Sequence, residues 1–358
     1  MPGLEKVTAS PAASAGGHGD EGPASLERRL RSWRPFPHEV AAAVYIAAGI
    51  FILERLPVTY PREALLLAAS FPIAWIAGFT AVLLAGREVA RRLRGRSRPV
   101  AFATEALILV RAALVLAPVL SVHFLLKSFI WLVNPRTWDA QLWELDRIVH
   151  FGLSPTLFLT VAFADGGFLR FLDVVYSGAY FFLIVVSVPV LLVVPQPSRR
   201  MAFLAAYTFI WMAGSVLYLA LPSWGPVFVV SDLFSGVLRH MPATVSVQEV
   251  LFGEISSLVK QPLAPRIVRF GSVAAFPSLH LAVVTVFTVA SRWVSGRWFL
   301  ANLVLVVLML VGSVVTGYHY LVDSWAGIAL GLAACSAGSR LFPSPCAATC
   351  GPDSPQRP

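Results

Sequence analysis

Long apolar runs separated by short polar segments occupy most of the chain. Each run is long enough to cross a hydrocarbon core of about 30 Å, which needs roughly 20 helical residues. The pattern predicts an all-α fold, a polytopic transmembrane helical bundle of about eight spans. We place these spans at residues 39–57, 63–86, 101–133, 168–194, 201–221, 272–293, 298–316 and 320–341.

Two of these runs carry further signals. The run 101–133 is too long for one straight span, so we expect it to tilt, bend or extend beyond the bilayer. Its ionisable residues lie near its two ends and are expected to snorkel towards the interfaces: Glu105 and Arg111 at the inner end, Lys127 at the outer end. In the last run, Gly327 and Gly331 form a small-xxx-small pair, which favours close helix packing.

The spacing of the apolar runs divides the chain into four predicted segments. A disordered cytoplasmic tail (1–38) precedes a two-span appendage with an arginine-rich cytoplasmic loop (39–100). A six-span catalytic core (101–342) follows, and then a second disordered tail (343–358). The inner loops of the core are short, whereas two long connections, near 134–169 and 222–271, lie on its outer face. We therefore expect function on the outer face, because sites concentrate on loops that a rigid scaffold positions.

Composition supports the membrane class. With 57% hydrophobic residues, 13% charged residues and a mean hydropathy of +0.73, the chain is too apolar for a soluble protein of its length. The net charge of +9 could suggest nucleic acid as a partner, but lysine and arginine concentrate in the predicted inner segments, as the positive-inside rule requires. This bias predicts a multi-pass protein of the cell membrane with both termini cytoplasmic and an extracytoplasmic active site.

Three residues form the candidate catalytic constellation. His280 and His319 begin two spans separated by an even number of crossings, so they lie on the same side of the membrane. Asp323 follows His319 by one helical turn, where its carboxylate can accept a hydrogen bond from the imidazole and fix its tautomer. A carboxylate inside an apolar span costs about 2.5–3.5 kcal/mol on insertion scales, so it calls for a partner.

This constellation suits in-line phosphoryl transfer. His319 would attack phosphorus and form a phosphohistidine, while His280 protonates the departing alkoxide and later deprotonates the acceptor. The alternative is that these histidines only pack or cap helices. Their pairing with Asp323 weakens that alternative. No sequence feature predicts a metal or a cofactor, and the outer carboxylates Asp139, Glu144 and Asp146 fit an amphipathic interfacial helix better than a metal site.

Two segments carry a family resemblance. Residues 277–280, Pro-Ser-Leu-His, resemble the Pro-Ser-Gly-His motif of the type 2 phosphatidic acid phosphatase superfamily. Residues 319–323, His-Tyr-Leu-Val-Asp, resemble the end of its third motif. The segments 276–280 and 319–323 are closer to the inositol phosphorylceramide synthase-like branch of membrane phosphotransferases, with Phe-Pro-Ser-Leu-His and His-Tyr-x-Val-Asp. The resemblance covers the six-span core. It implies His319 as nucleophile, Asp323 as its support and His280 as acid and base.

The chain also departs from the phosphatase pattern. Gly312 and Ser313 stand where the phosphatases have a Ser-Arg pair, and Gly214 and Leu221 stand where the cations of their first motif belong, although Pro222 is kept. A phosphoryl transition state still needs cations or oriented donors. The candidates for this role are Arg266, Arg269, Ser278, Tyr176 and Tyr180, with Tyr218 as a further aromatic residue near the cavity. The two arginines could equally bind lipid headgroups at the interface. The tyrosines could belong to the belt of aromatic residues that lies at the membrane–water interface, or could pack between helices.

Three functions remain open at the sequence level. The missing cations favour transfer of a phospho-headgroup between membrane lipids, and hydrolysis of a lipid phosphate is the close alternative. The two reactions differ only in whether an alcohol or water attacks the phosphohistidine. A non-enzymatic lipid transporter or scaffold is a third hypothesis, but it has no evident need for His280, His319 and Asp323. Membrane lipids are the expected partners, and the sequence specifies neither the headgroup nor the oligomeric state.

Overall fold

The computed structural model is a bundle of helices. It describes residues 23–57, 62–93, 102–163, 165–261 and 272–343. Every regular element in these ranges is a helix, so the predicted all-α fold is confirmed. Residues 87–93 of the expected arginine-rich loop belong to a helix, whereas 94–101 and 262–271 lie outside the described residues.

Six helices of the described part are long and apolar enough to cross a membrane. A seventh span would be a bent pair, with the two halves at 47° to each other. The pair is α8 (Gly166–Val174) and α9 (Tyr180–Leu192), joined by the π-helix η1 (Val175–Ala179). The six long helices are α2 (Pro37–Glu54), α3 (Arg62–Leu93), α4 (Phe102–Ser128), α10 (Pro197–Ala220), α15 (Gly296–Val315) and α16 (Leu321–Leu341).

The predicted span 272–293 needs correction. Its helix, α14, covers only Leu279–Ser291 and is shorter than a usual membrane span. Pro277 has no N–H to donate and disfavours helical geometry in the residue before it, and Ser278 caps the helix through its side chain. Residues 272–278 are therefore non-helical backbone inside the protein. The described residues support six or seven spans rather than eight.

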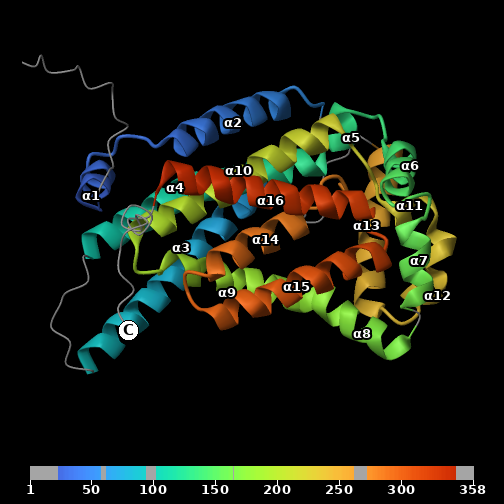
Figure 1. Cartoon of the computed structure of the whole chain (residues 1–358). Coiled ribbons are helices and arrows are strands. Elements are labelled where there is room, and N and C mark those ends of the chain that lie inside the picture. The colour runs from blue at the N-terminus through green and yellow to red at the C-terminus, as the bar shows by residue number, and fades with distance from the viewer. Residues whose placement is uncertain (1–22, 58–61, 94–101, 164, 262–271, 344–358) are drawn as a thin grey trace, which may run out of the picture.

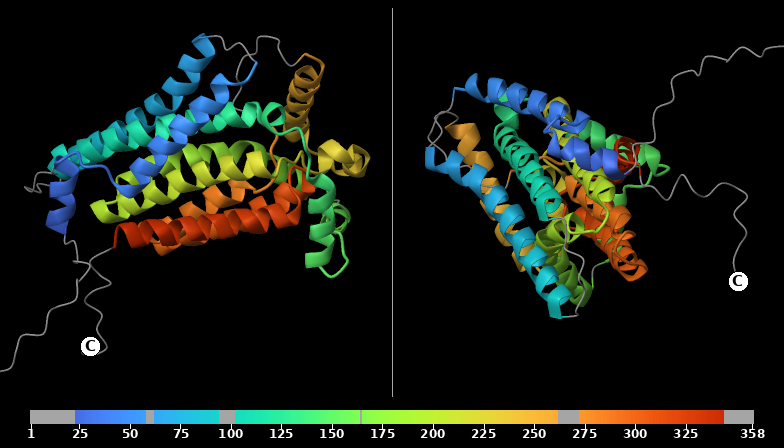
Figure 2. Two further views of the ribbon diagram at one scale, coloured as in Figure 1. Left: turned by 90° about the horizontal axis from the view of Figure 1, so that it is seen from above. Right: turned by 90° about the vertical axis from the view of Figure 1, so that its left-hand side faces the viewer.

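The long helices pack in layers. The view from above in Figure 2 shows α2 and α3 on one side of α4, with α10 and then α14 and α16 on its other side. Short helices and the 19-residue α13 gather at one end of this bundle in Figure 1. They are α5 (Ile130–Val133), α6 (Asp139–Val149), α7 (Pro155–Ala162), α11 (Pro226–Val229), η2 (Ser231–Phe234), α12 (Ser235–Leu238) and α13 (Pro242–Lys260).

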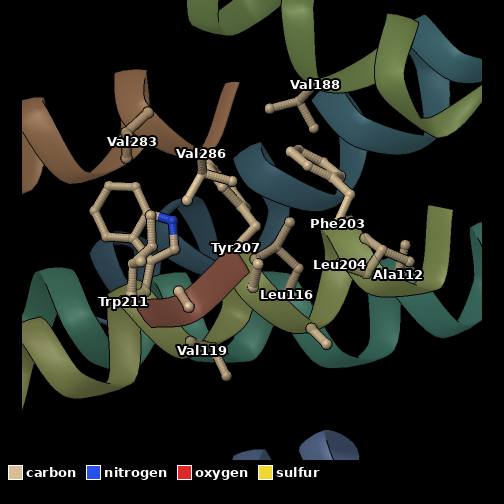
Figure 3. Packing of buried hydrophobic residues seen from close by; sticks show 14 of the residues in the cluster. Ala112, Leu116, Val119, Val188, Phe203, Leu204, Tyr207, Trp211, Val283 and Val286 are labelled. Carbon is tan, nitrogen blue, oxygen red and sulfur yellow. The ribbon is translucent and has the colours of Figure 1, made fainter. Parts of the chain in front are cut away.

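The main apolar core lies where α4, α9, α10 and α14 meet. Figure 3 shows Leu116 of α4, Val188 of α9, Tyr207 of α10 and Val286 of α14 converging on one another. All four side chains are almost completely buried. This packing makes a rigid scaffold behind the end of the bundle that carries the short helices.

Glycines set the distance between α14 and α16. A side chain at Gly327 would collide with the carbonyl oxygen of Ser278, and one at Gly331 would lie 2.8 Å from the carbonyl oxygen of Ala282. The expected close packing around this small-xxx-small pair is thus confirmed. It places the start of α14 directly against the start of α16, and the two predicted catalytic histidines lie there.

The predicted amino-terminal tail is partly ordered. Residues 23–31 form a helix, α1 (Pro23–Arg31), instead of a disordered segment. Leu26 and Leu30, one helical turn apart, are buried with Phe36 in the main core, whereas residues 1–22 lie outside the described part. The apolar spacing within this mostly polar segment explains its order.

The charges in the amino-terminal half of α4, Glu105 and Arg111, do not snorkel. Arg111 is 4% exposed, and its Nη1 lies 2.6 Å from Oε2 of Glu39 on α2. Glu105 binds both Arg87 of α3 and Arg200 of α10. The charges face the bundle interior in pairs because neighbouring helices supply partners within the low-dielectric region.

Candidate active site

The two predicted catalytic histidines lie side by side. Nε2 of His319 is 3.4 Å from Nδ1 of His280, and the two ring planes are inclined at 73°. His280 lies in the first turn of α14, and His319 lies in the turn between α15 and α16. Both residues are therefore on one end of the bundle, as the even number of crossings predicts.

The tautomer of His319 follows from a main-chain contact. Its Nδ1 is 2.8 Å from the carbonyl oxygen of Ala275, which can only accept a hydrogen bond. Nδ1 must then carry the proton, so Nε2 of the neutral ring has its lone pair directed towards His280. Burial lowers the pKa of His319, and the charge of Lys127 acts in the same direction. The ring is thereby kept in the neutral form that a nucleophile needs.

Asp323 lies near His319 but does not fix its tautomer by a hydrogen bond. The carboxylate Oδ2 is 3.6 Å from Nδ1 of His319 and accepts a bond of 2.9 Å from the Tyr320 N–H. The other oxygen, Oδ1, is buried without a partner among the described residues. Asp323 thus holds the first turn of α16 and places its carboxyl group behind the imidazole, while the Ala275 carbonyl accepts the hydrogen bond from Nδ1.

The segment that carries Ala275 is fixed by the loop after α10. Ser223 is fully buried, and its carbonyl oxygen accepts from the Ala275 N–H at 3.0 Å. Its hydroxyl accepts from the Phe276 N–H at 2.9 Å, and the peptide bond from Phe276 to Pro277 is cis. Ser223 therefore determines where the Ala275 carbonyl meets His319, a role that the sequence did not indicate.

Asp139 of α6 connects the same loop to the start of α16. Its carboxylate accepts from the main-chain N–H groups of Trp224 and Gly225 at 2.9–3.1 Å. It also accepts from the hydroxyl of Tyr320 at 3.1 Å. Since Asp139 is 5% exposed, the expected position on the water-facing side of an amphipathic helix is wrong for this residue.

Asp146, two turns later on α6, makes a second connection. Its Oδ1 accepts from the Val322 N–H at 2.9 Å, and the side chain is 2% exposed. Burial raises the pKa of this carboxyl group. Of the three carboxylates that the sequence places on the outer face, Glu144 is exposed. Acidic and apolar residues alternate in the same way on an interfacial helix and on one that clamps a loop, so the sequence could not separate these two cases.

Two glycines allow the loops to approach each other. Gly225 and Gly317 both have positive φ, +91° and +76°, in the region that favours glycine. A side chain at Gly225 would collide with the carbonyl oxygen of Tyr318, and Val227 donates its N–H to the carbonyl oxygen of Gly317 at 2.9 Å. The turn that carries His319 is therefore held by the loop after α10 as well as by α6.

A cavity of about 160 Å³ opens next to the histidine pair. Both histidines line it, together with Lys127 near the end of α4. The rest of its wall is mainly apolar or aromatic and comes from η1, α9, α13, the non-helical segment before α14 and the turn before α16. These wall residues are Tyr176, Ser177, Phe181, Val247, Leu251, Ser272, Val273, Ala274 and Tyr318.

The residues predicted to bind phosphate do not all lie at the cavity. The side chain of Ser278 is completely buried, and its hydroxyl oxygen caps α14 by accepting from the Leu281 N–H. Its N–H donates to the main-chain carbonyl of Asp323, so this donor serves the fold. Tyr176 lines the cavity and stacks on Tyr318 with ring centroids 5.7 Å apart. Tyr180 begins α9, but its side chain lies outside the described part of the structure. Arg266 and Arg269 lie wholly outside the described residues.

Packing fills three of the positions where the family pattern has phosphate ligands. A side chain at Gly312 would meet the ring of Tyr176 at 3.0 Å, and one at Gly214 would meet the side chain of Leu279 at 2.7 Å. Ser313 is completely buried, and its hydroxyl lies 3.0 Å from that of Ser324. These places have no room for longer cationic side chains. Lys127 is the cation that the described structure brings to the cavity instead.

Comparison with known proteins gives one match. A profile of the PAP2 superfamily matches residues 140–337, which is more than half of the chain and includes both histidines and Asp323. No curated protein and no solved structure matches the chain. With a histidine pair at one end of a polytopic helical bundle and this match across it, the chain belongs to the PAP2 superfamily, the type 2 phosphatidic acid phosphatases and related phosphotransferases.

Proposed function

We propose that this protein is a membrane lipid phosphotransferase that works through a phosphohistidine on His319. The observation that carries the proposal is the contact between the unprotonated Nε2 of His319 and Nδ1 of His280, at the wall of one cavity. A nucleophile and a proton donor within such reach are the elements that a two-step displacement at phosphorus needs.

The reaction would proceed in two balanced steps. In the first, Nε2 of His319 bonds to phosphorus, the bond from phosphorus to the leaving alcohol breaks, and His280 gives that alkoxide a proton. In the second, His280 takes the proton of an acceptor hydroxyl, whose oxygen bonds to phosphorus as the N–P bond breaks. The Ala275 carbonyl and the Asp323 carboxylate favour the positive charge that develops on His319 during the first step.

The wall of the cavity supports transfer to a lipid alcohol over hydrolysis. Phe181, Val247, Leu251 and Val273 give the cavity apolar sides that suit acyl chains and limit the access of water. Transfer of a phospho-alcohol headgroup from a glycerophospholipid to a lipid alcohol, as in the inositol phosphorylceramide synthase-like branch, fits this wall. Hydrolysis of a lipid phosphate is the alternative that experiment must separate from it.

The excess of lysine and arginine in the inner segments supports an orientation with both termini cytoplasmic. The histidine pair would then face the extracytoplasmic side of the cell membrane. A reporter fused to the carboxyl terminus that is active only in the cytoplasm tests this orientation, and activity of an export-dependent reporter at that position would contradict it.

Replacement of His319 by Gln tests the nucleophile. Gln keeps a polar side chain of similar length but cannot form the N–P bond, so we expect turnover to fall by roughly 10³-fold or more. Trapping with a ³²P-labelled lipid donor should give acid-labile, base-stable labelling of the unaltered chain and none of the variant. His240→Gln, which changes a histidine outside the cavity, is the matched control. Unchanged turnover in His319→Gln would exclude the covalent mechanism.

The reaction type is tested by comparing the lipids of cells with and without the protein. A missing phosphodiester lipid would identify donor and acceptor and support transfer. Purified protein in vesicles should then make the same lipid from the two substrates. Release of free phosphate from lipid phosphates, with no new phosphodiester formed with any alcohol, would replace transfer by hydrolysis.

A further inference from the structure

An exposed apolar surface covers the hairpin that α6 and α7 form at the end of the bundle where the histidine pair lies. The exposed residues share one face of each helix: Leu145, Ile148 and Val149 on α6, and Leu157, Phe158 and Val161 on α7. The exposed charges of α6, Glu144 and Arg147, pair with each other at 3.2 Å. The hairpin therefore presents apolar side chains that no part of the described chain covers.

The tip of this hairpin carries a phenylalanine that is almost completely exposed. Phe151 is 97% exposed, and Leu153 is exposed as well. The φ of Phe151 is +59°, which is uncommon for a bulky residue, and Gly152 follows with a φ of +86°. The turn thus holds the ring away from the protein. Because the ring adds almost nothing to the packing of the described chain, its counterpart lies outside the protein.

The direction of the hairpin points to the membrane as this counterpart. The long helices are of a length and composition to cross the bilayer, and α6 and α7 run crosswise to them at the end of the bundle (Figure 1, Figure 2). Helices in this position lie along the plane of the membrane. In the left view of Figure 2 the pair, drawn in green, projects sideways beyond α16. The hairpin is therefore placed over lipid and not over the other spans.

The surface of the hairpin adjoins a lipid-facing row of α15. Val304 and Val307 are exposed on one face of this apolar helix. Val311, one turn further along the same row, packs with Leu159 of α7 against the apolar cluster around Val315. In this way α7 lies against the end of a surface that meets acyl chains, so its own exposed face continues that surface.

A tryptophan marks the level of the membrane interface at the same place. Trp325, near the start of α16, is exposed, and its Nε1 donates to Nε2 of His150 at 3.3 Å. Nδ1 of His150 lies 2.6 Å from the main-chain oxygen of Asp146, which can only accept, so Nε2 is the atom that accepts from the tryptophan. Exposed tryptophans concentrate where headgroups meet acyl chains. The bond ties such a residue to the turn that carries Phe151.

We propose that the hairpin of α6 and α7 inserts its apolar faces and its tip at Phe151 into the membrane leaflet at the histidine end of the bundle. Its partner is the boundary between lipid headgroups and acyl chains, which amphipathic helices enter by about 5–10 Å. Since α6 also binds the start of α16 through Asp139 and Asp146, the lipid surface fixes the level of the cavity relative to the headgroups. This surface is independent of the reaction that the histidines catalyse.

Depth-dependent quenching of a fluorescent label tests the insertion. The native cysteines, Cys335, Cys346 and Cys350, are replaced by serine. Phe151→Cys is then labelled with a fluorescent maleimide in the full chain, reconstituted in phosphatidylcholine vesicles. Lipids brominated on their acyl chains should quench this label at least about twofold, and aqueous iodide should have little effect. Glu144→Cys, on the charged side of α6, is the matched control and should show the reverse.

Two results would overturn the proposal. Quenching of the label at position 151 by iodide and not by brominated lipid would show that the tip faces water. Protection of the same label from both quenchers would assign the surface to a protein contact, such as a second copy of this chain.

A second measurement uses the unaltered chain in the same vesicles. A lipid-soluble diazirine, activated by light, reacts with side chains that touch acyl chains. Trypsin cleaves after Arg147 and Arg170, so residues 148–170 are recovered as one peptide for mass spectrometry. We expect modification at Phe151 and Phe158, with Val304 of α15 as the positive control. An unmodified peptide 148–170 beside a modified Val304 would contradict the insertion even if the labelled variants fail to fold.

Discussion

A main-chain carbonyl determines the tautomer of His319, and burial keeps its ring neutral. The Ala275 oxygen takes the Nδ1 proton, and the buried position disfavours a second proton on Nε2. Asp323, which the sequence assigns to the first of these tasks, stands 3.6 Å away and binds the Tyr320 N–H instead. Sequence spacing identifies the residues of this site, but a main-chain acceptor from a segment 44 residues earlier leaves no sequence signal.

The pH dependence of the first chemical step follows from this environment. An ordinary histidine has a pKa of about 6.5. Because burial lowers the pKa of His319, its reactive neutral form persists as the pH falls below that value. Burial lowers the pKa of His319 to about 3, so we expect the acid limb of single-turnover phosphohistidine formation to lie well below pH 6.5. Measurement of the trapping rate from about pH 4 to 8 checks this, and a midpoint at or above pH 6.5 would contradict it.

At the scale of elements, α6 is a clamp on the catalytic turn. Asp139 and Asp146 together bind main-chain groups of the loop after α10 and of the first turn of α16. Buried carboxylates with several donors form strong, charge-assisted hydrogen bonds. In Figure 1, α6 lies at the end of the bundle. Its hydrogen bonds therefore join the loop after α10 to the start of α16 at that end.

Replacement of Asp139 by Ala should destabilise this end of the molecule. The change leaves the N–H groups of Trp224 and Gly225 without their acceptor, at about 1–3 kcal/mol for each buried donor. We expect a clear fall in the melting temperature and a loss of turnover. Glu144→Ala on the same helix removes an exposed carboxylate whose pair with Arg147 is worth at most about 1 kcal/mol, so it should change neither. Equal melting temperatures for the two variants would show that α6 is not a clamp.

The contact between α14 and α16 gives a second prediction at this scale. Gly327→Ala would drive a methyl group into the carbonyl oxygen of Ser278 and separate the two histidine-bearing elements. We expect destabilisation by roughly 1–3 kcal/mol and a lower turnover. Gly78→Ala is the control, because a side chain at Gly78 on α3 meets open space. The paired variants are compared by thermal melting in detergent, and an equal response at both positions would count against close packing as the constraint.

At the scale of the whole molecule, the amino-terminal helices are joined to the core by charge as well as by apolar packing. Arg111 of α4 binds Glu39 of α2 and the main-chain oxygens of Leu30 and Arg34. Phe36 also contacts Phe342, which follows α16, with ring centroids 5.1 Å apart. The two-span appendage expected from the sequence is thus attached to both ends of the described core sequence, at the end of the bundle opposite the histidines (Figure 1).

Arg111→Met tests this attachment. The variant leaves Glu39 buried without its cation, and loss of one partner of a buried pair costs about 3–5 kcal/mol. We expect a lower melting temperature and faster proteolytic cleavage near α1. Arg92→Met removes a cation that is 75% exposed and should leave both properties unchanged. Identical proteolysis of the two variants would mean that apolar contacts alone hold α1 and α2.

The sequence by itself determined the class of fold and the identity of the histidine pair. Apolar runs of membrane length admit only helices, because a backbone in lipid must satisfy its own hydrogen bonds, and an even number of crossings forces His280 and His319 to one side. The small-xxx-small spacing of Gly327 and Gly331 likewise acts within one helix, so it was visible along the chain.

Only the tertiary structure decided which groups complete the site. The Ala275 carbonyl, the clamp through Asp139 and the place of Lys127 beside the histidines depend on contacts between segments far apart in sequence. A charged residue near a helix end has the same local pattern whether it snorkels, pairs or faces a cavity. The neighbouring helix decides between these three arrangements. Its position depends on packing and on hydrogen bonds that the local sequence pattern does not show.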